Sequence, residues 1–295
     1  MSWQEQLEAD WQEQLEADGF CLLPQAVSAS TVAAAIAHWQ ALLQSPRVHA
    51  SLVMSAAGSV SGARNILDLW PEVVELLRVP AVGRAISLVL GPTACVVRGL
   101  YFDKPPGHSW ALPWHKDYTL AVQAHRPSAI VTKPTTKAGV PHVVAPADIL
   151  ERMLTVRIHL DPMTAENGPL RVIPGSHRNY HLADDPPRQP QTILCQAGDV
   201  LLMRPLVTHA SGHTVNGTIL HRRIVHFECA AAFPLPDGIT WKWAIPLTPQ
   251  PVREWGGEHS IVGASQLAVG ASQLDGGASC HPVAAAPMSH DSREE

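Results

Sequence analysis

A chain of 295 residues with 46% hydrophobic residues can bury a sizeable core, either as one large domain or as two smaller ones. Its formal net charge of −5 and isoelectric point near 6.3 argue against a basic surface for nucleic acid or for an anionic membrane. No apolar run is long enough for a transmembrane helix, and the first residues lack a signal-peptide pattern, so we expect a cytoplasmic protein.

The first residues of the chain contain the octapeptide WQEQLEAD twice, at 3–10 and 11–18. The apolar residues of the two copies fall four positions apart, which predicts a helix with one apolar stripe: Trp3, Leu7, Trp11 and Leu15. Gly19 is a typical residue to end such a helix. We therefore expect segment 1–18 to be an added helical segment without a catalytic role.

Two further stretches of the N-terminal part have helical character. Residues 28–44 (SASTVAAAIAHWQALLQ) combine capping Ser and Thr residues with an Ala/Leu-rich body that contains no Gly or Pro. Residues 71–91 (PEVVELLRVPAVGRAISLVLG) predict two short helices that are divided at Pro80. Helices are thus expected up to about residue 91.

From Cys95 onward the pattern changes to short β-branched and apolar runs separated by Pro and Gly. These runs are CVVRGLYF, MLTVRIHLD, RVIPGSH, TILCQAGDVLLM and RRIVHFECA. Many short strands with regularly placed turns predict an antiparallel sandwich, barrel or jelly roll. Because the helices precede the strands, we expect them to cover one face of a mainly β domain that spans residues 19–255.

The last part of the chain and the cysteines carry no sign of a site. Residues 256–295 are rich in Ala, Gly and Ser and repeat GASQL, so we expect a disordered low-complexity tail. The five cysteines are odd in number and lack a C-x-x-C spacing: Cys21, Cys95, Cys195, Cys229 and Cys280. This usage predicts reduced thiols rather than zinc ligands or disulfides.

The stretch LPWHKDYTL, residues 112–120, places His115 and Asp117 two positions apart. On a β-strand this spacing puts both side chains on one face, where an imidazole and a carboxylate can reach the same ion. The same spacing recurs at His159 and Asp161, so the pair alone does not establish a metal site. A jelly roll with this pair needs a distant second His to complete a two-His-one-carboxylate set.

The segment AGDVLLMRPLVTHASGH offers that second histidine, because His209 follows a turn and a buried strand. Three nearby histidines remain alternatives: His213, His221 and His226. Downstream, HRRIVHFE predicts a strand on which Arg222 and Arg223 face opposite ways. One of the two arginines can point inward and bind a dicarboxylate through paired charge-assisted hydrogen bonds.

With these motifs in this order, the sequence resembles the phytanoyl-CoA dioxygenase family of Fe(II)/2-oxoglutarate oxygenases. The matching stretches are YFDKPPGHSWALPWHKDYTL, KAGVPHVVAPADILERMLTVRIHLD, ENGPLRVIPGSHR, GDVLLMRPLVTHASG and RRIVHFE, with a weaker match at ADGFCLLP. The resemblance implies a double-stranded β-helix core, that is, a cupin-like jelly roll. It also implies that His115, Asp117 and His209 bind Fe(II), with 2-oxoglutarate and O₂ as co-substrates.

The resemblance assigns further residues to the co-substrate. Arg222 would hold the distal carboxylate of 2-oxoglutarate with help from Ser211, and Arg223 remains the alternative because the spacing from the distal histidine leaves the register open. The positions of Leu100, Lys116 and Arg157 correspond to others that line the same pocket. For Lys116 and Arg157, an ordinary solvent-facing role is equally compatible with the sequence.

The implied reaction is hydroxylation of an unactivated C–H bond of a small organic molecule, with release of succinate and CO₂. Asp117 favours hydroxylation over halogenation, since related halogenases replace this carboxylate by a small residue. The residues expected to wall the substrate are Tyr101, Lys104, Trp110, Trp114 and His142. The lysines Lys104, Lys133 and Lys137 lie in Pro-rich loops and do not make a convincing phosphate site for a coenzyme A ester.

Two other classes stay open at this point. One is a cupin-type metal enzyme that does not use 2-oxoglutarate, and the other is a non-catalytic jelly-roll protein that binds a small molecule. The expected partner is in each case a small molecule, with no nucleic acid and no membrane. The sequence does not indicate an oligomeric state.

Overall fold

The computed structural model describes residues 3–55 and 58–248, and the predicted low-complexity tail at 256–295 lies outside them. Helices dominate the first third of the chain, as predicted: α1 (Trp3–Asp18), α2 (Ala29–Leu43), η1 (Pro46–Ser51), α3 (Ile66–Leu69), η2 (Pro71–Leu77) and α4 (Pro80–Leu90). Short helical segments also interrupt the later strands: α5 (Ala147–Leu150), η3 (Ser176–Arg178), η4 (Leu182–Asp184) and η5 (Pro236–Gly238).

The helix boundaries follow local chemistry. Helix α2 begins after Ser28, whose Oγ accepts a hydrogen bond from the Thr31 backbone N–H at 3.1 Å, as an N-cap residue does. Segments η2 and α4 are divided at Pro80, which stands at the first position of α4, where its missing N–H costs nothing. The two predicted short helices and their division are therefore confirmed.

Helix α1 spans both copies of the repeated octapeptide and ends directly before Gly19. Gly19 has a φ of +85°, and a Cβ there would lie 2.4 Å from His177 Nδ1, so no other residue fits this junction. Leu15 of the second copy is buried in the main core. The predicted helix is confirmed, whereas the idea that segment 1–18 is an added unit stays a prediction.

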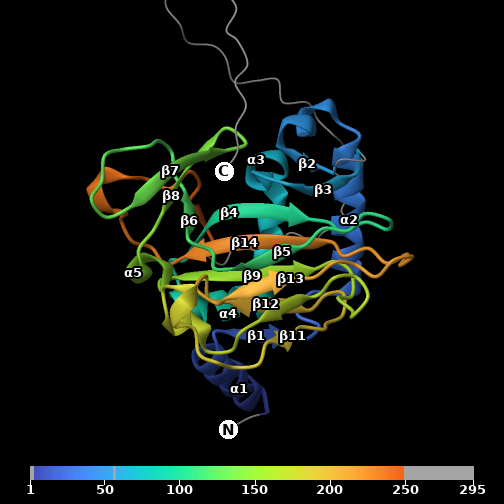
Figure 1. Ribbon diagram of the computed structural model, residues 1–295, viewed down its shortest axis with the longest axis horizontal. Helices are drawn as coiled ribbons and strands as arrows, with labels where there is room; N and C mark the ends of the chain where they lie inside the picture. The colour runs from blue at the N-terminus through green and yellow to red at the C-terminus, as the bar shows by residue number, and fades with distance from the viewer. Residues whose placement is uncertain (1–2, 56–57, 249–295) are drawn as a thin grey trace, which may run out of the picture. The chain divides into compact units, whose positions relative to one another are not determined.

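The largest sheet is antiparallel and has the strand order β1-β12-β9-β14-β4-β3-β2, with β15 also paired to β4. Figure 1 shows β4, β14, β9, β12 and β1 side by side in this order. Its strands are β1 (Phe20–Leu23), β2 (Leu52–Met54), β3 (Val60–Ala63), β4 (Cys95–Phe102), β9 (Met153–His159), β12 (Val200–Met203), β14 (Ile224–Ala230) and β15 (Ile245–Pro246).

Two smaller antiparallel sheets complete the β structure. The four-stranded sheet has the order β11-β10-β13-β5 and contains β5 (Leu112–His115), β10 (Leu170–Val172), β11 (Gln191–Thr192) and β13 (His209–Ser211). The three-stranded sheet has the order β6-β8-β7 and contains β6 (Thr119–Ala121), β7 (Thr132–Lys137) and β8 (Val140–Val144).

The two faces of the large sheet differ in chemistry. On β14, Val225, Phe227 and Cys229 belong to the main hydrophobic core together with apolar residues of α2 and α4. The alternate residues His226 and Glu228 are buried but polar, and they face a cavity. Strand period two thus separates a helix-covered apolar face from a polar interior face.

In the described part of the chain, no helix is both long and apolar enough to cross a membrane. Four of the cysteines are free thiols, as predicted: Cys21, Cys95, Cys195 and Cys229. Cys280 lies outside the described residues.

Candidate metal centre

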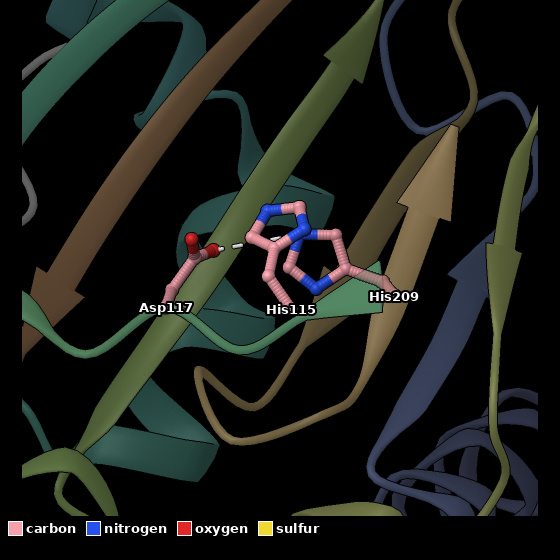
Figure 2. A group of neighbouring side chains, drawn as sticks. All are labelled: His115, Asp117 and His209. Atoms are coloured by element: carbon pink, nitrogen blue, oxygen red, sulfur yellow. Dashed lines mark ion pairs between the residues drawn. The ribbon is translucent and has the colours of Figure 1, made fainter. Parts of the chain in front are cut away.

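The three predicted ligands come together through strand pairing. His115 ends β5 and His209 begins β13, and the antiparallel register places these two residues directly opposite each other. Asp117 follows β5 and is fixed by its backbone N–H, which donates to the Pro205 carbonyl at 3.0 Å. One potential ligand atom from each side chain lies within 4.8 Å of the others, and Figure 2 shows the three side chains converging.

Both histidines are oriented by the same kind of hydrogen bond, from Nδ1 to the carbonyl two residues earlier. His115 Nδ1 is 2.7 Å from the Pro113 carbonyl, and His209 Nδ1 is 2.9 Å from the Val207 carbonyl. A carbonyl can only accept, so Nδ1 carries the proton in each ring and Nε2 is left with its lone pair, the arrangement seen in metal-binding histidines. Burial lowers the pKa of His209 to about 4, which keeps its imidazole neutral at neutral pH.

Asp117 supplies the carboxylate of the group, and its Oδ2 lies 3.8 Å from His209 Nε2. Burial disfavours the ionised carboxylate, but His209, His226 and His115 outweigh that effect, so the pKa of Asp117 is lowered. Two imidazoles and one carboxylate that approach from one side form the donor set of a facial triad, typical of non-haem Fe(II) sites. The residues present therefore fit a divalent transition metal.

The three side chains lie on the wall of a cavity of about 520 Å³ between the large sheet and the four-stranded sheet. Of the residues predicted to bind the co-substrate, four also line this cavity: Leu100, Arg157, Ser211 and Arg222. Its size is within the range of small-molecule sites, which run to about 300–1,000 Å³.

Arg222 is a buried cation without a carboxylate partner in the described part of the chain. Its side chain is 1% exposed, its Nη1 donates to the Gly168 carbonyl, and its Nε has no hydrogen-bond partner there. Burial, and after it the neighbouring Arg157, lower the pKa of Arg222 to about 9, so the guanidinium stays charged at neutral pH. Asp103 opposes this lowering from a distance, but no carboxylate is hydrogen-bonded to the guanidinium in the described part of the chain, so the buried Arg222 fits an anionic ligand.

Arg223 lies outside the cavity wall. It makes a bidentate ion pair with Asp161, in which Nε and Nη2 donate to the two carboxylate oxygens at 2.7 and 2.6 Å. The two arginines directly precede β14, which begins at Ile224, and their side chains take opposite directions, so only Arg222 is available to a ligand in the cavity.

Two predicted lysines take supporting positions. Lys104 is fully buried and its Nζ donates to Ser211 Oγ at 3.3 Å and to the carbonyls of Gly168 and Gly212. Burial, followed by the nearby Arg222 and Arg157, lowers the pKa of Lys104 to about 6. Lys104 thus links the Gly168 carbonyl, which also accepts from Arg222, to the segment that follows β13.

Lys116 points away from its neighbours His115 and Asp117. Its Nζ forms an ion pair with Asp185 at 2.7 Å and donates to the carbonyls of Ser176 and Leu206. This side chain fixes the loop behind the metal ligands and does not line the cavity.

The residues predicted to wall the substrate divide in two. Tyr101 and Trp110 line the cavity, and the Tyr101 ring also packs at a tilt against Trp39 with ring centroids 4.3 Å apart. Trp114 and His142 are not on the cavity wall: Trp114 lies under the Arg171 guanidinium, and His142 is a buried side chain of β8. Their role in substrate binding stays a prediction.

The alternative metal ligands do not form a second group with metal-ligand spacing in the described part of the chain. Asp161 is engaged by Arg223, while His159 is fully buried without a hydrogen-bond partner in the described part of the chain. His213 Nδ1 is hydrogen-bonded to Ser109 Oγ, and His221 Nδ1 is hydrogen-bonded to Asp103 Oδ1. Among the described residues, the only group of His, Cys, Asp and Glu with metal-ligand spacing is His115, Asp117 and His209.

Three further residues line the cavity that the sequence motifs did not predict: Arg64, Arg98 and Glu228. His226 was predicted only as a substitute for His209, and it instead contacts Arg157 from the adjacent strand, with Nδ1 3.4 Å from Nη1. The available signal was the isolated charge inside an otherwise apolar strand, as in CVVRGLYF and IVHFECA. A charge in a strand buried on both faces usually has a partner or a function.

Comparison with known proteins finds a family of dioxygenases. The family model for phytanoyl-CoA dioxygenase (PhyH) matches residues 15–223. The ectoine dioxygenases of Bordetella parapertussis and Bordetella bronchiseptica are each 26% identical over 180 residues, which cover 60% of this chain and 51% of theirs. The chain thus spans about half the length of the curated relatives it matches.

Solved structures share the fold. EctD from S. alaskensis with bound Fe superposes with a TM-score of 0.58 at 20% identity, covering 78% of this chain and 77% of that one. The non-heme alpha-ketoglutarate-dependent epimerase SnoN from nogalamycin biosynthesis gives a TM-score of 0.57 at 16% identity, covering 77% and 84%. The predicted mainly β, jelly-roll fold class is confirmed.

Proposed function

The chain belongs to the phytanoyl-CoA dioxygenase family, as its motifs predicted, and we propose that it is an Fe(II)- and 2-oxoglutarate-dependent oxygenase. The proposed reaction hydroxylates an unactivated C–H bond of a small organic molecule and releases succinate and CO₂. One observation carries the proposal: a two-His-one-carboxylate group and a buried arginine without a carboxylate partner among the described residues share one cavity.

In this proposal His115, Asp117 and His209 hold the iron. Bound there, Fe(II) would supply activation of O₂ coupled to oxidative decarboxylation of 2-oxoglutarate. The protein prepares the site by keeping the buried His209 imidazole neutral and by placing Nδ1 of both histidines on backbone carbonyls. The carboxylate of Asp117 would be the third metal ligand, at a position where related halogenases have a small residue, and its presence favours hydroxylation.

Arg222 is the proposed anchor for the distal carboxylate of 2-oxoglutarate. A guanidinium offers paired donors that match a carboxylate, and the Nε of Arg222 has no partner among the described residues. Ser211 lies two residues after His209 and its Oγ is held by Lys104, so a second donor is available beside the guanidinium. The apolar side chain of Leu100 lies on the same cavity wall.

The first test is an anaerobic titration of the Fe(II)-loaded protein with 2-oxoglutarate, followed through the weak visible charge-transfer band of such complexes. We expect the band in the wild type, its loss in His209→Ala and a binding constant weakened about 10- to 100-fold in Arg222→Gln. Arg223→Gln is the matched control, because its side chain pairs with Asp161 outside the cavity, and it should bind 2-oxoglutarate normally.

The same titration separates the alternatives. Iron binding without a band would contradict the role of 2-oxoglutarate and favour a cupin-type metal enzyme with another chemistry. A band without succinate formation, across a broad set of small molecules in air, would instead favour a jelly-roll protein that only binds.

A further inference from the structure

Three cations gather on the cavity wall away from Arg222: Arg64, Arg98 and Lys137. We call them the distal basic cluster. Arg98 on β4 lies opposite Glu228 on β14, and Glu228 is six residues beyond Arg222 along the chain. At the rise per residue of an extended chain, the backbone of Arg222 and that of Glu228 are roughly 20 Å apart. Asp117 interacts electrostatically with Arg98 and with His226, and His226 lies between Arg222 and Glu228 along the chain, so the metal group faces the stretch of wall between them.

The cluster is assembled from three separate elements. Arg64 follows β3, which pairs with β4 at Ala63 and Tyr101. Lys137 ends β7 at a tight turn, and the Asn65 side chain donates to the carbonyl of Ala138 in that turn at 3.0 Å. This hydrogen bond ties the residue after Arg64 to the residue after Lys137, so the two cations are held near each other and near Arg98.

The protein supplies too few anions for these cations. Arg98 donates to Glu228 Oε1 at 2.7 Å, but Lys137 reaches only the Thr119 hydroxyl at 3.3 Å. Within the described part of the chain, the Arg64 guanidinium has no hydrogen-bond or ion-pair partner. Burial and then Arg98 lower the pKa of Arg64, and burial, Arg98 and Arg64 lower that of Lys137, as expected for cations that repel one another.

The same excess holds for the cavity as a whole. Five Arg and Lys side chains line it, whereas the carboxylates on its wall are those of Asp117 and Glu228. An Fe(II) ion and a 2-oxoglutarate dianion would cancel each other's charge. An excess of three positive charges would therefore remain in a partly enclosed space, where charge is costly to leave unmatched.

We propose that the distal basic cluster binds an oxyanion of the substrate, a carboxylate or a phosphate monoester, and holds the remainder of the molecule toward the metal group. This inference rests on the proposed function and adds the substrate class: a small acidic molecule. Both oxyanions accept paired hydrogen bonds from Arg and a point charge from Lys, the donors present here. The cavity volume also limits the substrate to a small molecule, since 2-oxoglutarate occupies part of the same space.

The test uses the protein loaded anaerobically with Fe(II) and 2-oxoglutarate, so that the Arg222 site is already filled. Acetate, inorganic phosphate and neutral acetamide serve as probes at constant ionic strength, and the unfolding temperature reports binding. We expect acetate or phosphate to raise the unfolding temperature in a saturable manner and acetamide to leave it unchanged. The stronger of the two oxyanions identifies the kind of acid.

Variants locate the effect. Arg64→Gln and Lys137→Gln should each weaken oxyanion binding roughly ten-fold, because each removes one charge-assisted contact. Lys133→Gln is the matched control: it changes the same residue type on the same strand β7, but at an exposed position outside the cavity. Both cluster positions are only partly buried and lack carboxylate partners, so these variants should fold.

A screen for succinate formation gives the second measurement. Small carboxylic acids and phosphate monoesters are compared with their uncharged amides or alcohols, and only the acids should stimulate turnover. A normal 2-oxoglutarate band without any response to oxyanions would overturn this inference alone. So would equal stimulation by acids and amides, or equal loss in Lys133→Gln. Failure of the band would remove the proposed function and the substrate class with it.

Discussion

The two faces of the large sheet are built from the same strands and do different work. On one face, Val225 and Phe227 of β14 pack with the N-terminal helices in a continuous apolar core. On the other, His226 and Glu228 of the same strand face a cavity that also contains the metal group and five cations. Alternate residues of one strand thus divide between stability and chemistry.

The two faces contribute to different free energies, one to that of folding and the other to that of ligand binding. Burial of an apolar side chain on the helix-covered face contributes about 1.5–3 kcal/mol to folding, without any directional partner. Burial of the charged side chains on the cavity face opposes folding unless a partner or ligand offsets it. Substitutions on the first face should therefore change stability, and those on the second should change ligand binding.

The largest effect is expected on the cavity face, from His209→Ala. Loss of one of three ligands should lower turnover at least about 100-fold, since even partners outside the ligand set cost about 10–100-fold. Iron content and succinate formation measure this, and His213→Ala is the control because its exposed side chain contacts Ser109. Normal iron content in His209→Ala would contradict the ligand assignment.

On the helix-covered face, Phe227→Ala should lower the free energy of unfolding by about 3–5 kcal/mol, because it leaves a cavity in a close-packed core. Urea denaturation measures the loss. The affinity of the folded protein for 2-oxoglutarate should stay unchanged under stabilising conditions. A change in affinity as large as that of Arg222→Gln would mean that the two faces are not independent.

Arg98→Met tests a charged pair that belongs to the cavity face but is buried. It leaves the Glu228 carboxylate without its partner and should cost about 3 kcal/mol of stability at neutral pH, the low end of the range for buried pairs. Adding Glu228→Gln to the variant should recover part of this loss, since no buried charge then remains unpaired.

The pH dependence of that variant has a defined sign. Burial already raises the pKa of Glu228 above its usual 4.5, and Arg98 opposes the rise. Without Arg98 the folded-state pKa lies higher still, so the folded protein binds the proton more tightly than the unfolded chain. Stability of Arg98→Met should therefore fall as pH rises through and above that window. Urea midpoints near about pH 5 and pH 8 measure the difference, and a larger loss at the lower pH would contradict it.

The smallest expected effect is that of Ser28→Ala at the start of α2. Loss of the capping hydrogen bond to the Thr31 N–H should cost about 1 kcal/mol. Iron and 2-oxoglutarate binding should not change, because α2 lies on the helix-covered face. Thermal or urea unfolding measures the loss, and Gln40→Ala at an exposed position of the same helix is the matched control.

Much of the fold followed from local patterns. The division at Pro80, the Ser28 cap and the strands at 95–102 and 153–159 lie where the sequence predicts them, because each depends on neighbouring residues. The candidate ligands could also be predicted, since His-x-Asp and the later His209 belong to motifs of contiguous residues. The role of Lys116 could not be predicted, because the direction of its side chain depends on an ion pair with Asp185, far along the chain.

By itself the sequence determined the order of elements, the apolar and polar alternation of each strand, and the residue types able to bind a metal and a dicarboxylate. The tertiary structure decided which of Arg222 and Arg223 faces inward, because alternation fixes only that they oppose each other and sheet packing chooses the side. It also brought Arg64, Arg98 and Lys137 together from three distant segments. Such convergence depends on long-range pairing, and no local pattern encodes it.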